Sequence, residues 1–270
     1  MTKNASEFIG DIPENYDQRL GPVIFEDYAD DIARRAAALN PARVLELAAG
    51  TGIVSRQLKD ALGSAGHLTV TDLNAPMLEI AEAKFGAQEN VDFKTADAVE
   101  LDFPDNFFDL VVCQFGVMFF PDKIASYREA LRVLRPGGAY LFSAWGSLEE
   151  NPFAQVAQDI SERFFPDNPP GFYKVPFSYP DPETVKEDLA KAGLDDVEYE
   201  TIEIQKSVSD WGHFARGLVF GNPLIDEIRN RGGVDAEEVV QAIKHSLRDR
   251  FGPTRSSMPL KATVFQGRAK

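Results

Sequence analysis

The sequence has little cysteine, a deficit of basic residues and no long apolar run. Cys113 is the one cysteine among 270 residues. It excludes an intramolecular disulfide and a metal cage of several thiolates, and we expect no metal site. The formal net charge is −15. Nucleic acid is therefore not expected as a partner, because phosphate binding needs a basic surface.

The sequence also shows no pattern typical of a signal peptide or of a membrane-spanning helix. Residues 1–10 lack the apolar core of a signal peptide. The longest apolar stretch, residues 110–120, is interrupted by Gln114 and Gly116. It is far shorter than the roughly 20 residues that a membrane-spanning helix needs. Together with the low cysteine content, these features predict a soluble, cytoplasmic protein that does not bind membranes.

Between residues 41 and 146, short apolar runs alternate with segments of helical periodicity. We expect strands at 43–47, 67–71, 91–94, 108–113 and 139–144, and helices at 53–62, 76–85 and 122–134. Residues 135–138, Arg-Pro-Gly-Gly, are expected to end the last helix and turn into the fifth strand. Strands that alternate with helices through short links indicate a parallel sheet covered on both faces.

The flanking segments have other patterns. Residues 1–40 are predicted to form a helical N-terminal cap, because Ile24, Tyr28 and Ile32 recur at helical spacing. After the core at 41–146, residues 147–270 are predicted to continue the same domain. They include a helix from 182 to 193, strands at 197–204 and 261–265, and two insertions, the aromatic-rich segment 147–180 and the helical segment 210–252.

The segment 44–55 is the most informative. A strand ends, the chain turns through Gly50 and Gly52, and a helix begins at Ile53. Glycine permits positive φ and lets a ligand lie against the backbone, and a helix start offers free N–H groups; a purely structural turn is the alternative. The turn lacks the third glycine of a dinucleotide fingerprint. The carboxylate of Glu46 before it would disfavour a pyrophosphate and suit a ligand with a sulfonium group.

Two further acids follow the next two strands. Asp72 lies at the end of the second strand, where it suits hydrogen bonds to two ribose hydroxyls; NAD-binding folds place an acid similarly, and a helix N-cap is the alternative. Asp97 follows the third strand and suits the amine of adenine, with loop capping as the alternative. Because ligands bind at the carboxyl ends of strands in open α/β sheets, we expect these acids at one edge.

Taken in order, these motifs resemble those of class I S-adenosylmethionine (SAM)-dependent methyltransferases, and most closely the type 11 group that includes quinone-biosynthesis C-methyltransferases. The resemblance covers residues 15–145 and rests on segments 46–52 and 134–138, Asp72, and Asp97-Ala98. It implies an α/β, Rossmann-like, seven-stranded, mostly parallel sheet with helices on both faces, an antiparallel last strand and helical lid insertions. It also implies methyl transfer from SAM, with S-adenosylhomocysteine as product, to a small-molecule acceptor.

The resemblance assigns residues to the methionine part of SAM. Gly50 and Gly52 would face it, Glu46 would support the turn and the amino group, and Gln114 would lie beside the methionine or the methyl group. Simple support of the turn is the alternative for Glu46, and packing at the sheet end is the alternative for Gln114. The residues expected around SAM are Tyr16, Glu46, Ala48, Gly50, Gly52, Asp72, Leu73, Met77, Asp97, Ala98 and Gln114.

For the adenosine part, Asp72 would bind the ribose, Leu73 and Met77 would pack near adenine, and Asp97 with Ala98 would hold its edge. A tyrosine in the N-terminal segment, Tyr16, resembles one that closes over SAM in such enzymes. The N-terminal helix and the two insertions would form the lid and acceptor pocket. For the aromatic segment 153–179, a small additional core is the alternative.

No strong catalytic motif is present. Methyl transfer from a sulfonium is an in-line displacement that mainly needs alignment and exclusion of water, and a base is optional. His213 and Tyr16 are the weak candidates for catalysis, with solvent exposure as the alternative for both. The fourth strand ends in Cys113-Gln114-Phe115-Gly116, rather than the Asn/Asp-Pro-Pro-Tyr signature of many amino- and nucleobase-methylating enzymes. An O- or C-acceptor is therefore favoured.

The sequence leaves three other functions to be weighed. The missing third glycine, Glu46 and the lack of a Tyr-x-x-x-Lys site argue against an NAD-dependent oxidoreductase. The intact glycine turn argues against a non-catalytic module with a SAM-binding fold, and aminopropyl transfer is a third alternative. Either a monomer or a homodimer is expected.

Overall fold

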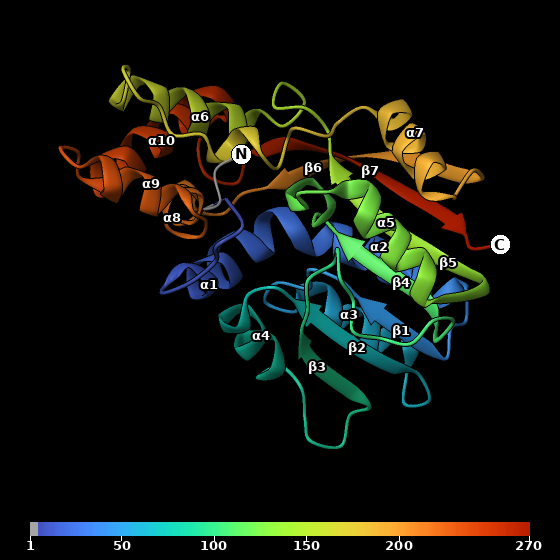
Figure 1. Cartoon of the computed structure of the whole chain (residues 1–270). Helices are drawn as coiled ribbons and strands as arrows, with labels where there is room; N and C mark the ends of the chain where they lie inside the picture. Colours follow the sequence, from blue (N-terminus) through green and yellow to red (C-terminus); the bar gives the residue numbers. More distant parts are fainter. Residues whose placement is uncertain (1–4) are drawn as a thin grey trace.

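The computed structural model describes residues 5–270, in which seven strands form one sheet (Figure 1). The strand order is β3-β2-β1-β4-β5-β7-β6, and β7 runs antiparallel to both of its neighbours while the pairs from β3 to β5 are parallel. The predicted Rossmann-like α/β fold with an antiparallel last strand is thus confirmed. The strands are β1 (Arg43–Glu46), β2 (His67–Asp72), β3 (Val91–Thr95), β4 (Phe108–Gln114), β5 (Leu134–Trp145), β6 (Val197–Ser207) and β7 (Ser257–Arg268).

Helices cover both faces of the sheet, and the alternation within each strand explains how. Val44 packs into a cluster with Ile32 of α2 (Glu26–Ala38) and Leu58 of α3 (Ile53–Leu62). Its neighbour Leu45 belongs to the cluster on the other face, with Tyr127 of α5 (Lys123–Val133). Because successive strand side chains point to opposite faces, a short apolar strand serves two cores at once.

The N-terminal segment contains a feature that the sequence pattern did not predict. After α1 (Ile12–Asn15), the chain forms a π-helix, η1 (Tyr16–Phe25), before α2 begins. Pro22 lies inside η1. A proline removes an α-helical hydrogen bond and its ring clashes with the carbonyl four residues earlier, so Pro22 disfavours regular α winding in this segment. The first four residues of the predicted cap 1–40 lie outside the described residues.

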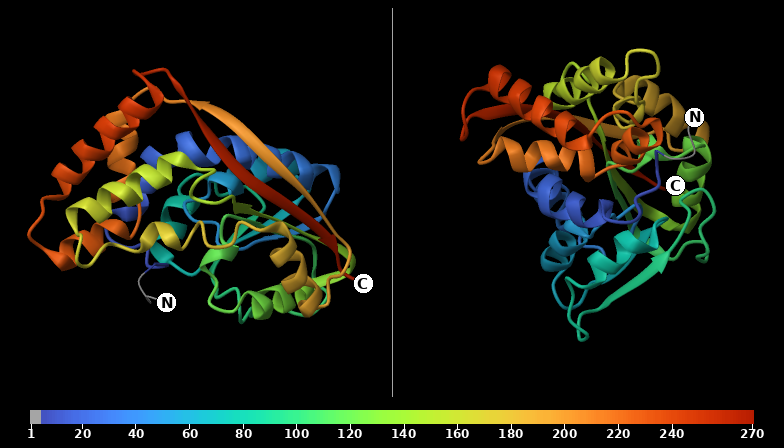
Figure 2. Two further views of the ribbon diagram at one scale, coloured as in Figure 1. Left: turned by 90° about the horizontal axis from the view of Figure 1, so that it is seen from above. Right: turned by 90° about the vertical axis from the view of Figure 1, so that its left-hand side faces the viewer.

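The C-terminal insertions form a group of helices beside the carboxyl ends of the parallel strands (Figures 1 and 2). They are α6 (Pro152–Phe164), α8 (Trp211–Phe220), α9 (Leu224–Arg231) and α10 (Ala236–Phe251). The helical nature of 210–252 is as predicted, whereas α6 was not predicted within the aromatic segment. The helix α7 (Pro182–Ala192) covers α5 on the other side of the molecule.

Several boundaries differ from those predicted. The helix α4 (Ala75–Glu82) stops before residue 85, because Lys84 and Phe85 make tighter bonds to carbonyls three residues back. Strand β5 starts at Leu134, which pairs with Phe108 before an irregularity in the register, so residues 135–138 belong to the strand rather than to a separate turn. Within residues 5–270, no helix is long and apolar enough to span a membrane.

Candidate active site

The turn between β1 and α3 requires an unusual backbone. Ala48, Gly50 and Gly52 have φ of 51°, 58° and 79°. A Cβ added at Gly52 would lie 2.7 Å from the Cβ of Ala81 in α4, so this glycine is needed for both its conformation and the close approach. Ala48 has a side chain in a conformation that costs about 1–2 kcal/mol, which marks the turn as a strained segment held by its surroundings.

Asp72 at the end of β2 holds this turn in place. Its Oδ2 accepts a hydrogen bond from the N–H of Gly50 at 2.8 Å, and its Oδ1 accepts from the N–H of Asn74 at 2.8 Å. The Asn74 side chain in turn bonds the backbone of Ser6 and Phe8. Burial raises the pKa of Asp72. One carboxylate therefore connects β2, the glycine turn and the N-terminal segment.

Glu46 lies buried at the end of β1, with 1% of its surface exposed. Its Oε2 has no hydrogen-bond partner within residues 5–270, and neither has the buried Oε1 of Gln114. Burial is the main cause that raises the pKa of Glu46 to about 8, and the nearby Asp72 carboxylate contributes to the rise. Two residues with unpartnered buried acceptors in the lining of one cavity fit a ligand that donates several hydrogen bonds, such as an ammonium group.

We predict that Glu46→Gln stabilises the protein by an amount that grows with pH. The folded pKa is about 8, whereas an unfolded glutamate titrates near about 4.3. Between these values the folded state retains a proton that the unfolded state has released, so the wild type loses stability as pH rises, by up to about 1.4 kcal/mol per pH unit. Urea unfolding of both proteins between about pH 5 and about pH 8 measures this difference.

Glu89→Gln serves as the control for the pH-dependent stability predicted for Glu46→Gln. Arg56 lowers the pKa of Glu89 to about 2, so this side chain is charged in both states over the whole interval and its effect should be constant with pH. A difference between wild type and Glu46→Gln that does not change with pH would show that Glu46 is ionised in the folded protein.

A small cavity at the glycine turn, called the turn cavity below, is lined by both of these residues, Glu46 and Gln114. Four of the residues predicted to surround SAM line it, Tyr16, Glu46, Ala48 and Gln114, together with Phe25, which the sequence pattern does not single out. The complete lining is Tyr16, Phe25, Glu46, Ala48, Ala49, Ile53, Val54 and Gln114. Sequence periodicity gave no signal for Phe25, because it lies far from the turn in the chain.

The remaining residues expected around SAM take other positions. Met77 is buried beneath the turn, with its methyl group 3.4 Å from a Cβ added at Gly50. Leu73 is 53% exposed. Asp97 is exposed and accepts a hydrogen bond from the N–H of Val99 at 3.0 Å, which is the loop-capping alternative. Ala98 is buried in the core.

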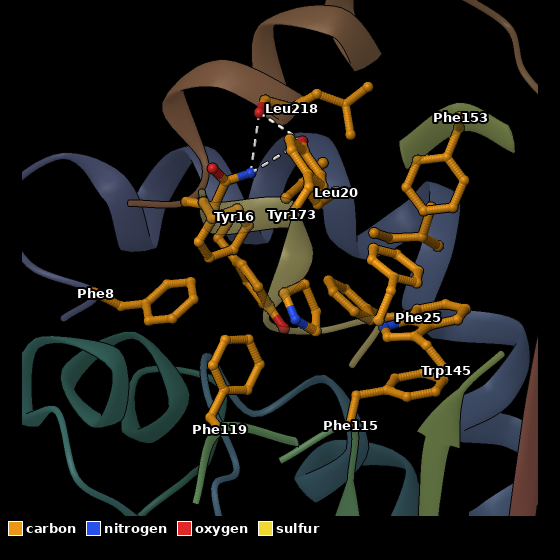
Figure 3. Close-up of a pocket in the computed structure, with 15 residues that line it drawn as sticks. Phe8, Tyr16, Leu20, Phe25, Phe115, Phe119, Trp145, Phe153, Tyr173 and Leu218 are labelled. Carbon is orange, nitrogen blue, oxygen red and sulfur yellow. Dashed lines mark hydrogen bonds between the residues drawn. The ribbon is translucent and has the colours of Figure 1, made fainter. Parts of the chain in front are cut away.

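A second, aromatic cavity (Figure 3) adjoins the first, because the two share Tyr16 and Phe25 in their walls. Its residues come from η1, the ends of β4 and β5, α6, α8 and the loop 172–177, so both insertions contribute to it. None of the lining residues is acidic or basic. They are Phe8, Tyr16, Leu20, Ile24, Phe25, Phe115, Phe119, Trp145, Phe153, Phe172, Tyr173, Pro176, Phe177, Leu218 and Asn222.

Polar groups in the aromatic cavity are few and mutually bonded. Tyr173 donates to the carbonyl of Leu218 at 2.7 Å, and Asn222 donates to the same carbonyl at 3.0 Å (Figure 3). His213, a candidate for catalysis, lines neither cavity. It is exposed on α8, where its ring nitrogens contact the Gln18 carbonyl and the Arg19 guanidinium. The structure therefore does not bring His213 to the site.

Solved structures share this fold. The YcgJ protein from Bacillus subtilis is 21% identical, with a TM-score of 0.54 over 88% of this chain and 99% of that one. Phosphoethanolamine N-methyltransferase 2 from Haemonchus contortus, solved with S-adenosyl-L-methionine, is 19% identical, with a TM-score of 0.58 over 95% of this chain and 56% of that one. The likeness to these structures shows the fold, a Rossmann-like sheet whose order and antiparallel β7 they share.

The model of the ubiE/COQ5 methyltransferase family matches residues 6–168, and the chain belongs to this family. Ubiquinone/menaquinone biosynthesis C-methyltransferases UbiE are similar: that of Pseudomonas aeruginosa is 35% identical over 170 residues, and that of Shewanella frigidimarina 32% over 177 residues. These matches cover 58% and 61% of this chain and 66% and 70% of the relatives. The chain thus spans just under two thirds of the Pseudomonas relatives. SAM as the expected cofactor is confirmed at the level of the family.

Proposed function

We propose that this protein transfers a methyl group from SAM to a carbon or oxygen atom of a small, apolar, ring-containing acceptor. The observation that carries the proposal is the pair of adjoining cavities. One is polar and lies at the glycine turn, and the other is aromatic and uncharged. Such a pair suits a charged cofactor on one side and an apolar acceptor on the other.

The turn cavity has the groups that SAM needs. Glu46 and Gln114 would accept hydrogen bonds from its ammonium group, and the first N–H groups of α3 would bind its carboxylate. Asp72 would accept from the ribose hydroxyls, because each carboxylate oxygen can accept more than one hydrogen bond. SAM supplies an electrophilic methyl group on a sulfonium sulfur. The protein supplies alignment and a site closed to water.

The aromatic cavity restricts the acceptor. Because none of its lining residues is charged, a carboxylate or phosphate held away from the sulfonium of SAM would lose its hydration without a compensating partner. The cavity also contains no carboxylate or imidazole to act as a general base, so the acceptor must bring a nucleophilic carbon or an already ionised hydroxyl. A quinol ring meets both conditions, which agrees with the names of the Pseudomonas and Shewanella relatives.

Which acceptor binds is nevertheless decided by residues of this chain that the family match does not include. The family match ends at residue 168, whereas Tyr173, Leu218 and Asn222 in the wall of the aromatic cavity lie beyond it. We expect the protein to act as a monomer or homodimer on a free small molecule. Its net charge of −15 argues against a nucleic-acid acceptor.

Two measurements test the proposal. Isothermal titration with SAM, S-adenosylhomocysteine and NAD should show binding of the first two and not of NAD. Incubation with SAM and a reduced naphthoquinone should then give a product heavier by one methylene group, whereas phosphoethanolamine should not be methylated because the cavity is uncharged. Binding of NAD alone would overturn the assignment, and methylation of phosphoethanolamine would contradict the proposed acceptor class.

A further inference from the structure

Two residues line both cavities, Tyr16 and Phe25. Their rings are stacked, with centroids 4.8 Å apart and planes inclined by 23°. Phe25 also approaches Phe115 and Trp145, at centroid distances of 6.0 and 6.3 Å in the aromatic cavity. The stacked pair therefore belongs to the walls of both the turn cavity and the aromatic cavity.

The π winding of η1 brings these two rings together. Phe25 lies nine positions after Tyr16, at the other end of η1. In an α-helix of about 3.6 residues per turn, residues nine apart are separated by about two and a half turns and face opposite sides. In a π-helix, with bonds between residues five apart, nine residues make about two turns and face the same side. The stack thus depends on a winding that is rare in proteins.

Both rings are also connected to the turn cavity. The Gln114 side chain donates to the carbonyl of Phe25 at 3.3 Å, while its own Oε1 lies buried without a partner within residues 5–270. The hydroxyl of Tyr16 lies 3.9 Å from a Cβ added at Gly50. A ligand that fills the turn cavity would meet the Tyr16 ring and would offer donors to Gln114. A ligand in this cavity would therefore contact Tyr16 directly and affect Phe25 through the hydrogen bond from Gln114.

We propose that the stacked Tyr16–Phe25 pair is a partition between the two cavities, and that the cofactor parts the two rings when it fills the turn cavity. The inference rests on the proposed function, because in-line transfer requires the methyl carbon within about 3–3.5 Å of the nucleophile. Two stacked rings between the cavities prevent that approach. Tyr16 and Phe25 are positioning residues, and the acceptor side joins the cofactor side only after the cofactor has bound.

Trp145 provides the readout, because it lines the aromatic cavity close to Phe25. The protein is titrated with S-adenosylhomocysteine while tryptophan emission is recorded, and binding is measured in parallel by calorimetry. We expect the emission to shift until it saturates, with a midpoint at the same ligand concentration as the midpoint measured by calorimetry. The shift should be absent in Trp145→Phe, which retains Trp211, and present in Trp211→Phe.

Variants of the pair separate the partition from a purely structural role. Tyr16→Phe keeps the ring and should keep the emission shift. Tyr16→Leu removes the stack, so its ligand-free emission should already resemble that of the bound wild type, and S-adenosylhomocysteine should add no shift although calorimetry shows binding. Phe25→Leu should behave like Tyr16→Leu and replaces it if that variant does not fold.

The outcomes distinguish the two proposals. Calorimetric binding to the wild type without an emission shift would overturn the partition and leave the proposed function standing. A leucine variant that responds like the wild type would do the same. Absence of S-adenosylhomocysteine binding to the wild type would overturn the proposed function, and the partition with it.

Discussion

Asp72→Ala should weaken SAM binding by about 100-fold or more. The substitution leaves the N–H groups of Gly50 and Asn74 without their carboxylate acceptor and removes the group proposed to bind the ribose. Hydrogen bonds to a charged group contribute about 1.5–3 kcal/mol each, and about 1.4 kcal/mol corresponds to a tenfold change in affinity. Isothermal titration with SAM and S-adenosylhomocysteine measures the loss.

Asp181→Ala is the matched control for this aspartate. Asp181 also accepts hydrogen bonds from two backbone N–H groups, those of Glu183 and Thr184, but at the start of α7 and outside both cavities. Loss of such a cap should reduce stability by about 1 kcal/mol, with SAM affinity unchanged. If Asp72→Ala binds SAM as tightly as the wild type, Asp72 supports the conformation of the glycine turn but does not bind the cofactor.

Gly52→Ala should cause the largest loss of stability among conservative substitutions in the turn. The added Cβ would lie 2.7 Å from the Cβ of Ala81 and 2.9 Å from its Cα, so α3 and α4 must move apart. Overpacking of this kind costs about 1–3 kcal/mol, and the left-handed conformation costs about 1–2 kcal/mol more. Thermal or urea unfolding measures the total, and SAM binding should be lost with the geometry of the turn.

Gly137→Ala isolates the effect of the close approach. Gly137 has the same φ of 79° as Gly52, but a Cβ added there has nothing within 4 Å. Its substitution should therefore cost only the conformational part, about 1–2 kcal/mol, and leave SAM binding intact. Equal losses in the two variants would mean that α4 yields easily and that the packing against Ala81 is not important.

The sequence predicted the turn half of the site better than the aromatic half, for a physical reason. Glu46 and Asp72 lie at the ends of the first two strands, and in a parallel sheet the order of strands brings such ends together. Asp97 also follows a strand, yet its carboxylate caps the local loop at Val99, because a backbone N–H two residues away competes for the same oxygen.

Residues of the aromatic half come from segments that the pattern could not relate to one another. The approach of Tyr16 to Phe25 depends on π winding, which no periodicity of apolar residues reveals. The position of His213 had a readable signal, however. Trp211, Phe214 and Leu218 lie at helical spacing and are buried, and His213 falls outside that face of the helix.

The uncharged walls of the aromatic cavity have an energetic consequence for the proposed reaction. A sulfonium donor is positive, and an ionised acceptor is negative, so methyl transfer between them cancels two opposite charges. A medium of low dielectric constant raises the free energy of separated charges. It raises the free energy of the transition state less than that of the reactants, because both charges have already diminished there. The aromatic cavity has no charged side chain in its lining, so it lowers the barrier to a transfer that cancels the charges of donor and acceptor. This effect does not depend on the shape of the acceptor ring.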